Sequence, residues 1–223
     1  NGSLRYNLIV RYAGIKSVFQ YPLFTSKDII FQTAKIFTEN SIGEIVDPHP
    51  FIKSGKHESD LVFDKNCKHI VLWLSASGES KRWGVDNFLK VTNKVSKERE
   101  CKFYLAGGSA DQKVIDEFIG KSECKNFFSL TDLSIKEVIS ILKHADLYLG
   151  NDTGFMHISS ALGVKCIGIF IDSPAYAYSG YTKNIEAIIP RGETINSTTH
   201  NTNGRDKISS DEVINKVLEY IAK

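Results

Sequence analysis

The chain has 223 residues, 42% of them hydrophobic and 24% charged, which is enough to bury the core of one large domain or of one domain plus part of another. Its 28 basic and 26 acidic residues give a net charge of +2, which argues against a dedicated nucleic-acid binder, because such proteins usually carry a strong basic excess. No apolar run is long enough to cross a membrane, so we expect no spanning segment.

The first region, residues 1–65, has no regular alternation of strand-like and helix-like patterns. Residues 8–12 fit either a strand or the end of a helix, and residues 26–40 carry apolar side chains at helical spacing. The breaker Asp47-Pro48-His49-Pro50 follows. We therefore expect residues 1–65 to be the tail of a preceding domain plus a connector.

The second region, residues 66–223, alternates between apolar strand-like runs and amphipathic helix-like runs, which predicts an α/β fold with a Rossmann-like parallel sheet and helices on both faces. The expected strands are 69–74, 102–106, 126–129, 146–149 and 165–170. The expected helices are 85–98, 111–120, 135–144, 155–162 and 210–222. Residues 172–208 are less regular and are expected to form surface loops that carry several tyrosines.

The four cysteines show no metal-binding spacing. They are Cys67, Cys101, Cys124 and Cys166, and no pair has the C-x-x-C pattern, so a zinc site is not expected. Cys101 and Cys166 lie in or beside apolar runs and are expected to be buried thiols. This usage favours a reducing, cytoplasmic setting.

The most informative turn joins the strand at 146–149 to the helix at 155–162 through Gly150-Asn151-Asp152-Thr153-Gly154. A helix that begins at the carboxyl end of a parallel strand presents free backbone N–H groups and the positive end of its dipole, which favours an anion such as phosphate. His157 lies one helical turn further on. The alternative is that Asp152 or Thr153 only caps the helix, and that His157 is an ordinary core histidine.

A second turn follows the first strand of the sheet and reads Ser75-Ala76-Ser77-Gly78-Glu79-Ser80-Lys81-Arg82-Trp83. The hydroxyls of Ser75 and Ser77 can bond phosphate oxygens, and Lys81 supplies a mobile positive charge just before a helix. That charge can stabilise the negative charge growing on a departing diphosphate. The alternative is a solvated loop with an exposed lysine.

A third turn, Gly107-Gly108-Ser109-Ala110-Asp111, ends the strand at 102–106. Gly107 and Gly108 permit positive φ or the close approach of a ligand. All three turns lie at carboxyl ends of expected parallel strands, which is the edge where open α/β sheets bind ligands. We therefore expect Gly107, Gly108 and Asp111 to contribute to the same site.

The two motifs Ser-Ala-Ser-Gly-Glu-Ser-Lys81-Arg-Trp and Gly-Asn-Asp152-Thr-Gly-Phe-Met-His157 together resemble the signature blocks of glycosyltransferase family 9, the ADP-heptosyltransferases of the lipopolysaccharide core. The order matches the family's, with the Gly-Gly turn between. The likeness covers about residues 66–223, and a weaker likeness is found at Ala13–Val18. It implies a GT-B fold, of which residues 66–223 would form the C-terminal, nucleotide-sugar donor-binding domain and residues 1–65 the end of the acceptor domain plus a connector.

The resemblance also implies roles for the residues around the diphosphate. Ser77 and Lys81 would bind it, and Thr153 and Gly154 would offer it backbone N–H groups. Asp152 would contact the hydroxyls of the donor sugar or orient the phosphate site. His157 would lie near the diphosphate or the sugar, so Lys81 and Asp152 are the expected catalytic residues.

Two further positions follow from the same likeness. Leu133 would lie near the adenine, and Asp111 is the nearest match to an acidic residue that family members place near the ribose, with the local alignment open by one position. An ADP-sugar would be the donor substrate. The acceptor would be a lipopolysaccharide core presented at the inner face of the inner membrane, which implies a cytoplasmic protein with peripheral membrane contact.

The implied reaction is an inverting transfer of a sugar, heptose in this family, from the ADP-sugar to the acceptor. No Asp-x-Asp metal motif is present, so we expect no metal and no required cofactor. Family members are longer and begin with a strand and a Gly-Asp loop that supplies the proposed general base, and no match to that loop is found here. We therefore expect a chain that starts late in the acceptor domain, as a fragment, an expressed portion or a truncated product.

Three alternatives remain open at this point. The chain could be another GT-B enzyme that uses a UDP- or GDP-sugar, or a non-catalytic nucleotide-sugar-binding domain. A phosphatase or phosphotransferase with Asp152 as nucleophile would need a strand-end Asp-x-Asp pattern, which the sequence lacks.

Overall fold

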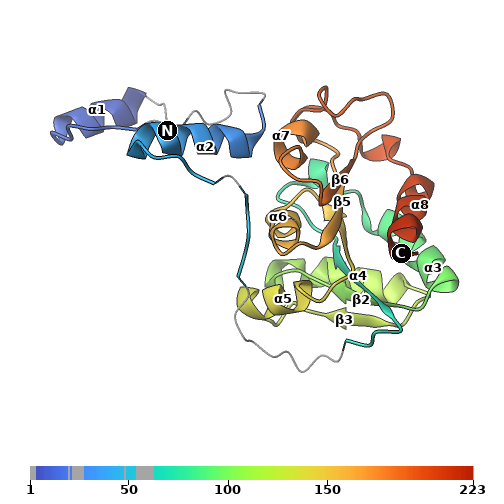
Figure 1. Ribbon diagram of the computed structural model, residues 1–223. Helices are drawn as coiled ribbons and strands as arrows, with labels where there is room; N and C mark the ends of the chain where they lie inside the picture. Colours follow the sequence, from blue (N-terminus) through green and yellow to red (C-terminus); the bar gives the residue numbers. More distant parts are fainter. Residues whose placement is uncertain (1–3, 20, 22–27, 48, 54–62, 223) are drawn as a thin grey trace.

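The structure is a computed structural model of the whole chain, and it describes residues 4–19, 21, 28–47, 49–53 and 63–222. Its centre is a six-stranded sheet in the order β3-β2-β1-β4-β5-β6, in which every neighbouring pair is parallel (Figure 1). The strands are β1 (Lys68–Trp73), β2 (Cys101–Leu105), β3 (Phe127–Ser129), β4 (Leu147–Asn151), β5 (Lys165–Ile169) and β6 (Ile185–Ile188). This confirms the expected Rossmann-like α/β fold.

Helices cover both faces of the sheet. One face carries α3 (Val85–Glu98), α4 (Gln112–Lys121) and α8 (Ser210–Ile221), and the other carries α5 (Ile135–Leu142), α6 (Gly154–Ala161) and α7 (Ala175–Ser179). Three single-turn 3₁₀ helices, η1 (Glu79–Lys81), η2 (Ser109–Asp111) and η3 (Arg205–Lys207), lie in the loops. The expected helices in this region are therefore confirmed to within about two residues at each end.

The two faces follow from the alternation of side chains along each strand. In β1, Ile70 and Leu72 pack into the core under α3, α4 and α8, whereas Val71 packs into the core under α5 and α6. All three side chains are almost completely buried. A strand buried on both faces reads as a continuous apolar run, which explains why the central strands could be recognised in the sequence.

Residues 172–208 are more ordered than expected. They form α7, the edge strand β6 and η3, so the prediction of a purely irregular surface loop is wrong. Tyr178 and Tyr181 pack against the core on the side of α5 and α6, and Ser173 and Thr198 are buried. The elements are short, and their conformation is decided by pairing with β5 and by packing rather than by a local pattern.

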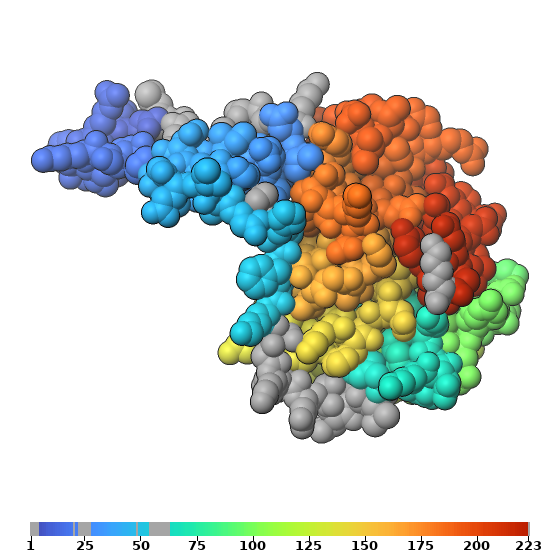
Figure 2. Space-filling model, viewed as in Figure 1, coloured from blue at the N-terminus to red at the C-terminus, as the bar shows by residue number. Residues whose placement is uncertain are grey.

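The N-terminal region contains α1 (Leu4–Tyr12) and α2 (Ile30–Ile42). Of the two readings for residues 8–12, the helical one holds; for the expected helix at 26–40, residues 26 and 27 lie outside the described part. None of the residues 5–53 whose burial the structure describes is buried. Figure 2 shows this segment projecting from the body of the molecule, with α2 next to α7, where the rings of Phe31 and Tyr181 stack at 5.4 Å.

Candidate functional site

The candidate site lies at the carboxyl ends of β1 and β4, which are neighbours in the sheet. After β1 the chain turns to α3 on one face, and after β4 it turns to α6 on the opposite face. The two connections diverge from neighbouring strands, and such a point in the strand order is the place where open α/β sheets bind ligands. Both motifs singled out in the sequence begin here.

The side chain of Asn151 ties the two turns together. It is fully buried, its Nδ2 donates to the carbonyls of Leu74 (2.8 Å) and Ser75 (3.2 Å), and its Oδ1 accepts from the backbone N–H of Trp83 (3.0 Å). One amide at the end of β4 therefore holds both ends of the β1–α3 loop. Its position within the motif was visible in the sequence, but its role as a clamp was not expected.

The N-terminus of α6 is free of a side-chain cap. Thr153 occupies the N-cap position with extended backbone, but its side chain does not cap the helix, and its hydroxyl bonds instead to the phenol of the fully buried Tyr148 at 3.1 Å. Gly154 then begins the helix. Thr153 therefore does not cap the helix with its side chain, as the alternative interpretation of the sequence proposed. Backbone N–H groups at the start of α6 remain available to an anion.

Asp152 lies beside this corner with a side chain that is only 9% exposed. Burial raises the pKa of its carboxyl, while a hydrogen bond with Ser173 and the nearby charges of His157, Lys81 and His200 oppose the rise. The carboxylate is therefore surrounded by cationic or potentially cationic groups from three segments. The structure thus brings Lys81, Asp152 and His157 into one electrostatic cluster, and adds Ser173 and His200, which the sequence analysis did not single out.

His157 lies one turn into α6. Its Nδ1 is 2.7 Å from the phenol oxygen of Tyr181, and its Nε2 is 3.9 Å from Oδ1 of Asp152. Burial lowers the pKa of the imidazole, and Asp152 acts in the opposite direction. The alternative of an ordinary core histidine does not describe it, because the ring remains partly exposed and faces a carboxylate.

The β1–α3 loop places its polar residues at different depths. Ser75 is buried, Ser77 is exposed, and Lys81 is half-buried at the end of η1. Arg82 forms an ion pair with Glu79 at 3.3 Å, and Trp83 is buried with its indole N–H donating to the carbonyl of Ile208. Lys81 is thus the basic side chain of this loop whose charge reaches Asp152.

The remaining predicted residues lie further along the same edge. Asp111 accepts a hydrogen bond from the N–H of Gly108 at 2.9 Å, so its carboxylate caps the turn. A Cβ at Gly107 would stand 2.9 Å from Cβ of Asp111, and the turn therefore needs glycine there for close packing rather than for positive φ. Leu133 follows β3 and packs partly against the core beside α5.

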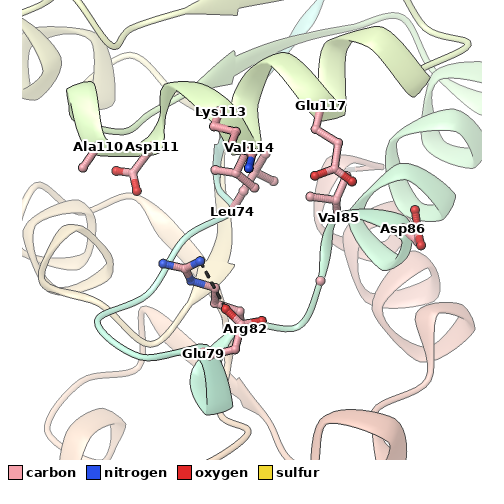
Figure 3. Close-up of a pocket in the computed structure, with 11 residues that line it drawn as sticks. Leu74, Glu79, Arg82, Val85, Asp86, Ala110, Asp111, Lys113, Val114 and Glu117 are labelled. Carbon is pink, nitrogen blue, oxygen red and sulfur yellow. Dashed lines mark hydrogen bonds and ion pairs between the residues drawn. The ribbon is translucent and has the colours of Figure 1, made fainter.

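A cavity of about 410 Å³ opens on the α3 and α4 side of this edge (Figure 3). Figure 3 shows Asp111 and Lys113 on the side of α4, facing the ion-paired Glu79 and Arg82 of the loop. Of the predicted site residues, only Asp111 lines this cavity. The cluster around Asp152 lies at the end of β4 and is not part of it.

Two further properties concern the described part of the chain only. It contains no group of three or more His, Cys, Asp or Glu residues placed to hold a metal ion. Within the same residues, no helix is both long and apolar enough to pass through a membrane. Cys67, Cys101 and Cys166 are buried free thiols, as expected for the last two.

Comparison with known proteins adds the evidence that decides the family. The family model described as glycosyltransferase family 9 (heptosyltransferase) matches residues 44–207. The chain belongs to this family.

Lipopolysaccharide heptosyltransferase 1 of Campylobacter coli is 26% identical over 200 residues, which are 87% of this chain and 54% of that protein. Lipooligosaccharide heptosyltransferase 2 of Campylobacter jejuni is 32% identical over 121 residues, 52% of this chain and 37% of that protein. The chain thus spans about half or less of the length of these curated relatives.

Solved structures of this family share the fold. The Escherichia coli heptosyltransferase WaaC with ADP aligns over 85% of this chain and 56% of its own, with a TM-score of 0.63 and 14% identity. The family 9 glycosyl transferase of Veillonella parvula aligns over 97% of this chain and 59% of its own, with a TM-score of 0.62 and 16% identity. The Rossmann-like sheet found here is therefore that of the GT-B heptosyltransferases.

Proposed function

We propose that this chain forms the donor-binding part of a heptosyltransferase, which transfers heptose from ADP-heptose to a lipopolysaccharide core acceptor with inversion at the anomeric carbon. The observation that carries the proposal is the convergence of Lys81, the uncapped start of α6 at Gly154 and the Asp152–His157 pair at the ends of β1 and β4. Membership of family 9 and the ADP complex of WaaC support the choice of donor.

The proposed chemistry begins with attack of an acceptor hydroxyl on the anomeric carbon. A new carbon–oxygen bond forms to the acceptor, the bond from the anomeric carbon to the phosphate oxygen breaks, and ADP leaves with that electron pair. Lys81 and the backbone N–H groups at Gly154 stabilise the charge that grows on the diphosphate. The acceptor's proton passes to a general base, which we assign to no residue of this chain.

The other predicted residues take supporting roles in the proposal. Ser75 and Ser77 line the diphosphate side of the loop, and Asp152 and His157 face the sugar or the phosphate nearest to it. Asp111, with Gly107 and Gly108, lies on the ribose side, and Leu133 lies on the adenine side. The acceptor is presented at a membrane surface, to which the protein binds peripherally from the cytoplasm.

Calorimetric titration of the chain with ADP, UDP and GDP tests this proposal. We expect saturable binding that prefers ADP and weakens at least tenfold in Lys81→Ala, because a charged hydrogen bond to phosphate contributes about 1.5–3 kcal/mol. Lys90→Ala removes an exposed lysine from the middle of α3 and should bind ADP as the unchanged chain does. Preference for UDP or GDP would instead indicate another GT-B enzyme, and equal binding by Lys81→Ala would remove Lys81 from the site.

A further inference from the structure

Tyr181 lies between the candidate site and the N-terminal region. Its phenol oxygen is 2.7 Å from Nδ1 of His157, and its ring stacks on Phe31 of α2 with 5.4 Å between centroids and 27° between planes. His157 in turn faces Oδ1 of Asp152 through Nε2 at 3.9 Å. A continuous series of contacts thus runs from α2 to the carboxylate at the end of β4.

We propose that Tyr181 is a positioning residue of the site, which holds the imidazole of His157 as the tautomer with its proton on Nε2, and that Phe31 keeps the phenol ring in place. The inference rests on the proposed function, since it gives His157 its place in the donor site. It extends that function to a residue outside both sequence motifs.

The phenol of Tyr181 carries a proton that it can donate in the first contact. Burial raises the pKa of Tyr181 to about 12, so the phenol keeps its proton at neutral pH. A neutral imidazole has one donor and one acceptor nitrogen, and burial favours the neutral form of His157 by lowering its pKa. In the proposed arrangement Tyr181 donates to Nδ1 and the imidazole proton stays on Nε2; in the other tautomer Nδ1–H would donate to the phenol oxygen.

The second contact favours the same tautomer. An ionised carboxylate only accepts hydrogen bonds, so a lone pair on Nε2 would repel Oδ1 of Asp152, whereas an Nε2–H is attracted to it. Asp152 precedes the start of α6 by two residues, so the same Nε2 lies near the carboxylate beside that corner. His157 then offers a donor to a phosphate or sugar oxygen without carrying a full positive charge into a partly buried site.

The third contact explains why α2 matters to a site built on the sheet. Ile29, two residues before Phe31 in the chain, also lies close to Gly180, the residue before Tyr181. The residues that follow α7 are thus in contact with the N-terminal region as well as with His157. A displacement of α2 would let the Tyr181 ring move, and His157 would then no longer be held in one tautomer.

Nitrogen-15 NMR of the full chain labelled in its histidines tests the proposal, with the signals of His157 assigned from His157→Gln. The unchanged chain should show one protonated Nε2 and one unprotonated Nδ1 for this ring. Tyr181→Phe keeps the ring but removes the hydroxyl, and it should give averaged shifts of the two tautomers. Tyr220→Phe is the matched control, because the Tyr220 phenol bonds to Oε2 of Glu186 at 2.7 Å on the α8 side of the sheet, and it should leave the His157 signals unchanged.

An Nδ1-protonated His157 in the unchanged chain, or identical signals in Tyr181→Phe, would overturn the role of Tyr181. Phe31→Ala should shift the His157 signals part of the way toward those of Tyr181→Phe, and unchanged signals would overturn the role of α2.

ADP titration separates this proposal from the function on which it rests. We expect about fivefold weaker ADP binding in Tyr181→Phe, which corresponds to one net hydrogen bond. A tautomer change in a chain that binds no nucleotide would support the positioning role and contradict the proposed function.

Discussion

The two regions of this molecule differ in how their helices are held. In residues 63–222, every helix of eight or more residues buries apolar side chains against a six-stranded sheet, and side chains such as Phe88 and Phe118 are completely buried. In residues 4–53, α1 and α2 are regular helices, yet apolar side chains on both stay exposed: Tyr12 of α1 is 96% exposed and Ile42 of α2 is 58% exposed. Helical pattern alone thus does not indicate how much a segment contributes to stability, because most of that contribution comes from tertiary packing.

The largest expected effect contrasts one phenylalanine from each region. Phe118→Ala should lower the free energy of unfolding by about 3–5 kcal/mol, because a fully buried aromatic ring leaves a cavity in the core. Phe51→Ala, at a position 80% exposed, should change it by less than about 0.5 kcal/mol. Urea denaturation followed by circular dichroism measures both. Similar losses in the two variants would show that residues 4–53 are as tightly packed as the sheet.

The clamp at the end of β4 should give the next largest effect. Asn151→Ala leaves two carbonyls and one N–H without their partner, and we expect a loss of about 2–3 kcal/mol in the free energy of unfolding. Asn215→Ala, on the exposed side of α8, is the control and should be close to neutral. The same denaturation series measures both. A neutral Asn151→Ala would mean that the β1–α3 loop is held by other contacts.

The pH dependence of stability should show a smaller effect with a definite sign. The pKa of Asp152 is raised by burial, so the folded state binds its proton more tightly than the unfolded state does. The stability contributed by this group is therefore greatest at low pH and falls as the pH rises from the unfolded pKa of about 3.9 through the folded pKa.

Asp152→Asn should remove that fall and make the chain more stable at pH 7 than the unchanged protein. Denaturation at several pH values between 3 and 7, the lower limit about one unit below the unfolded pKa, measures it. The opposite result would be a free energy of unfolding that rises with pH in the unchanged chain relative to Asp152→Asn. It would show that the charges of Lys81 and the histidines lower the pKa of Asp152 by more than burial raises it. A loss of stability at pH 7 from the buried Asp152 carboxylate is typical of residues that are kept for function rather than for stability.

The smallest effect is expected where the two regions meet. Phe31→Ala removes the stacked contact with Tyr181 and should lower the free energy of unfolding of the sheet region by no more than about 1 kcal/mol. Phe19→Ala, at a position 60% exposed, provides the control and should be neutral. Fluorescence-monitored unfolding is suitable because both tryptophans, Trp73 and Trp83, lie in the sheet region. A loss of several kcal/mol would make α2 part of the core.

The sequence predicted the sheet well where strands are buried on both faces. β1, β2, β4 and β5 read as apolar runs, and the bounds of α3 were predicted as Val85–Glu98 because its apolar residues follow helical spacing closely. β6 and α7, with 4 and 5 residues, were missed, whereas the 3-residue β3 was found because it stands between two clear helix-like runs. Such short elements form through pairing with β5 and burial against the sheet, which no local pattern records.

The candidate site was predicted in part for a similar reason. Lys81, Asp152 and His157 belong to compact motifs, so their chain positions could be recognised. Tyr181 and His200 reach the same cluster only through the fold, after the chain has passed through β5 and α7. No spacing rule links them to Asp152, and their proposed involvement follows from the packing of three separate segments.

The buried amide at the end of β4 has a consequence for the thermodynamics of binding. Because Asn151 already fixes the carbonyls of Leu74 and Ser75 and the N–H of Trp83, a ligand does not have to order this loop when it arrives. Ordering mobile side chains costs about 0.5–1.5 kcal/mol each in binding, and here that entropy is lost during folding instead. A weakened clamp would therefore appear in calorimetry as a less favourable entropy of association, even with every group that touches the ligand intact.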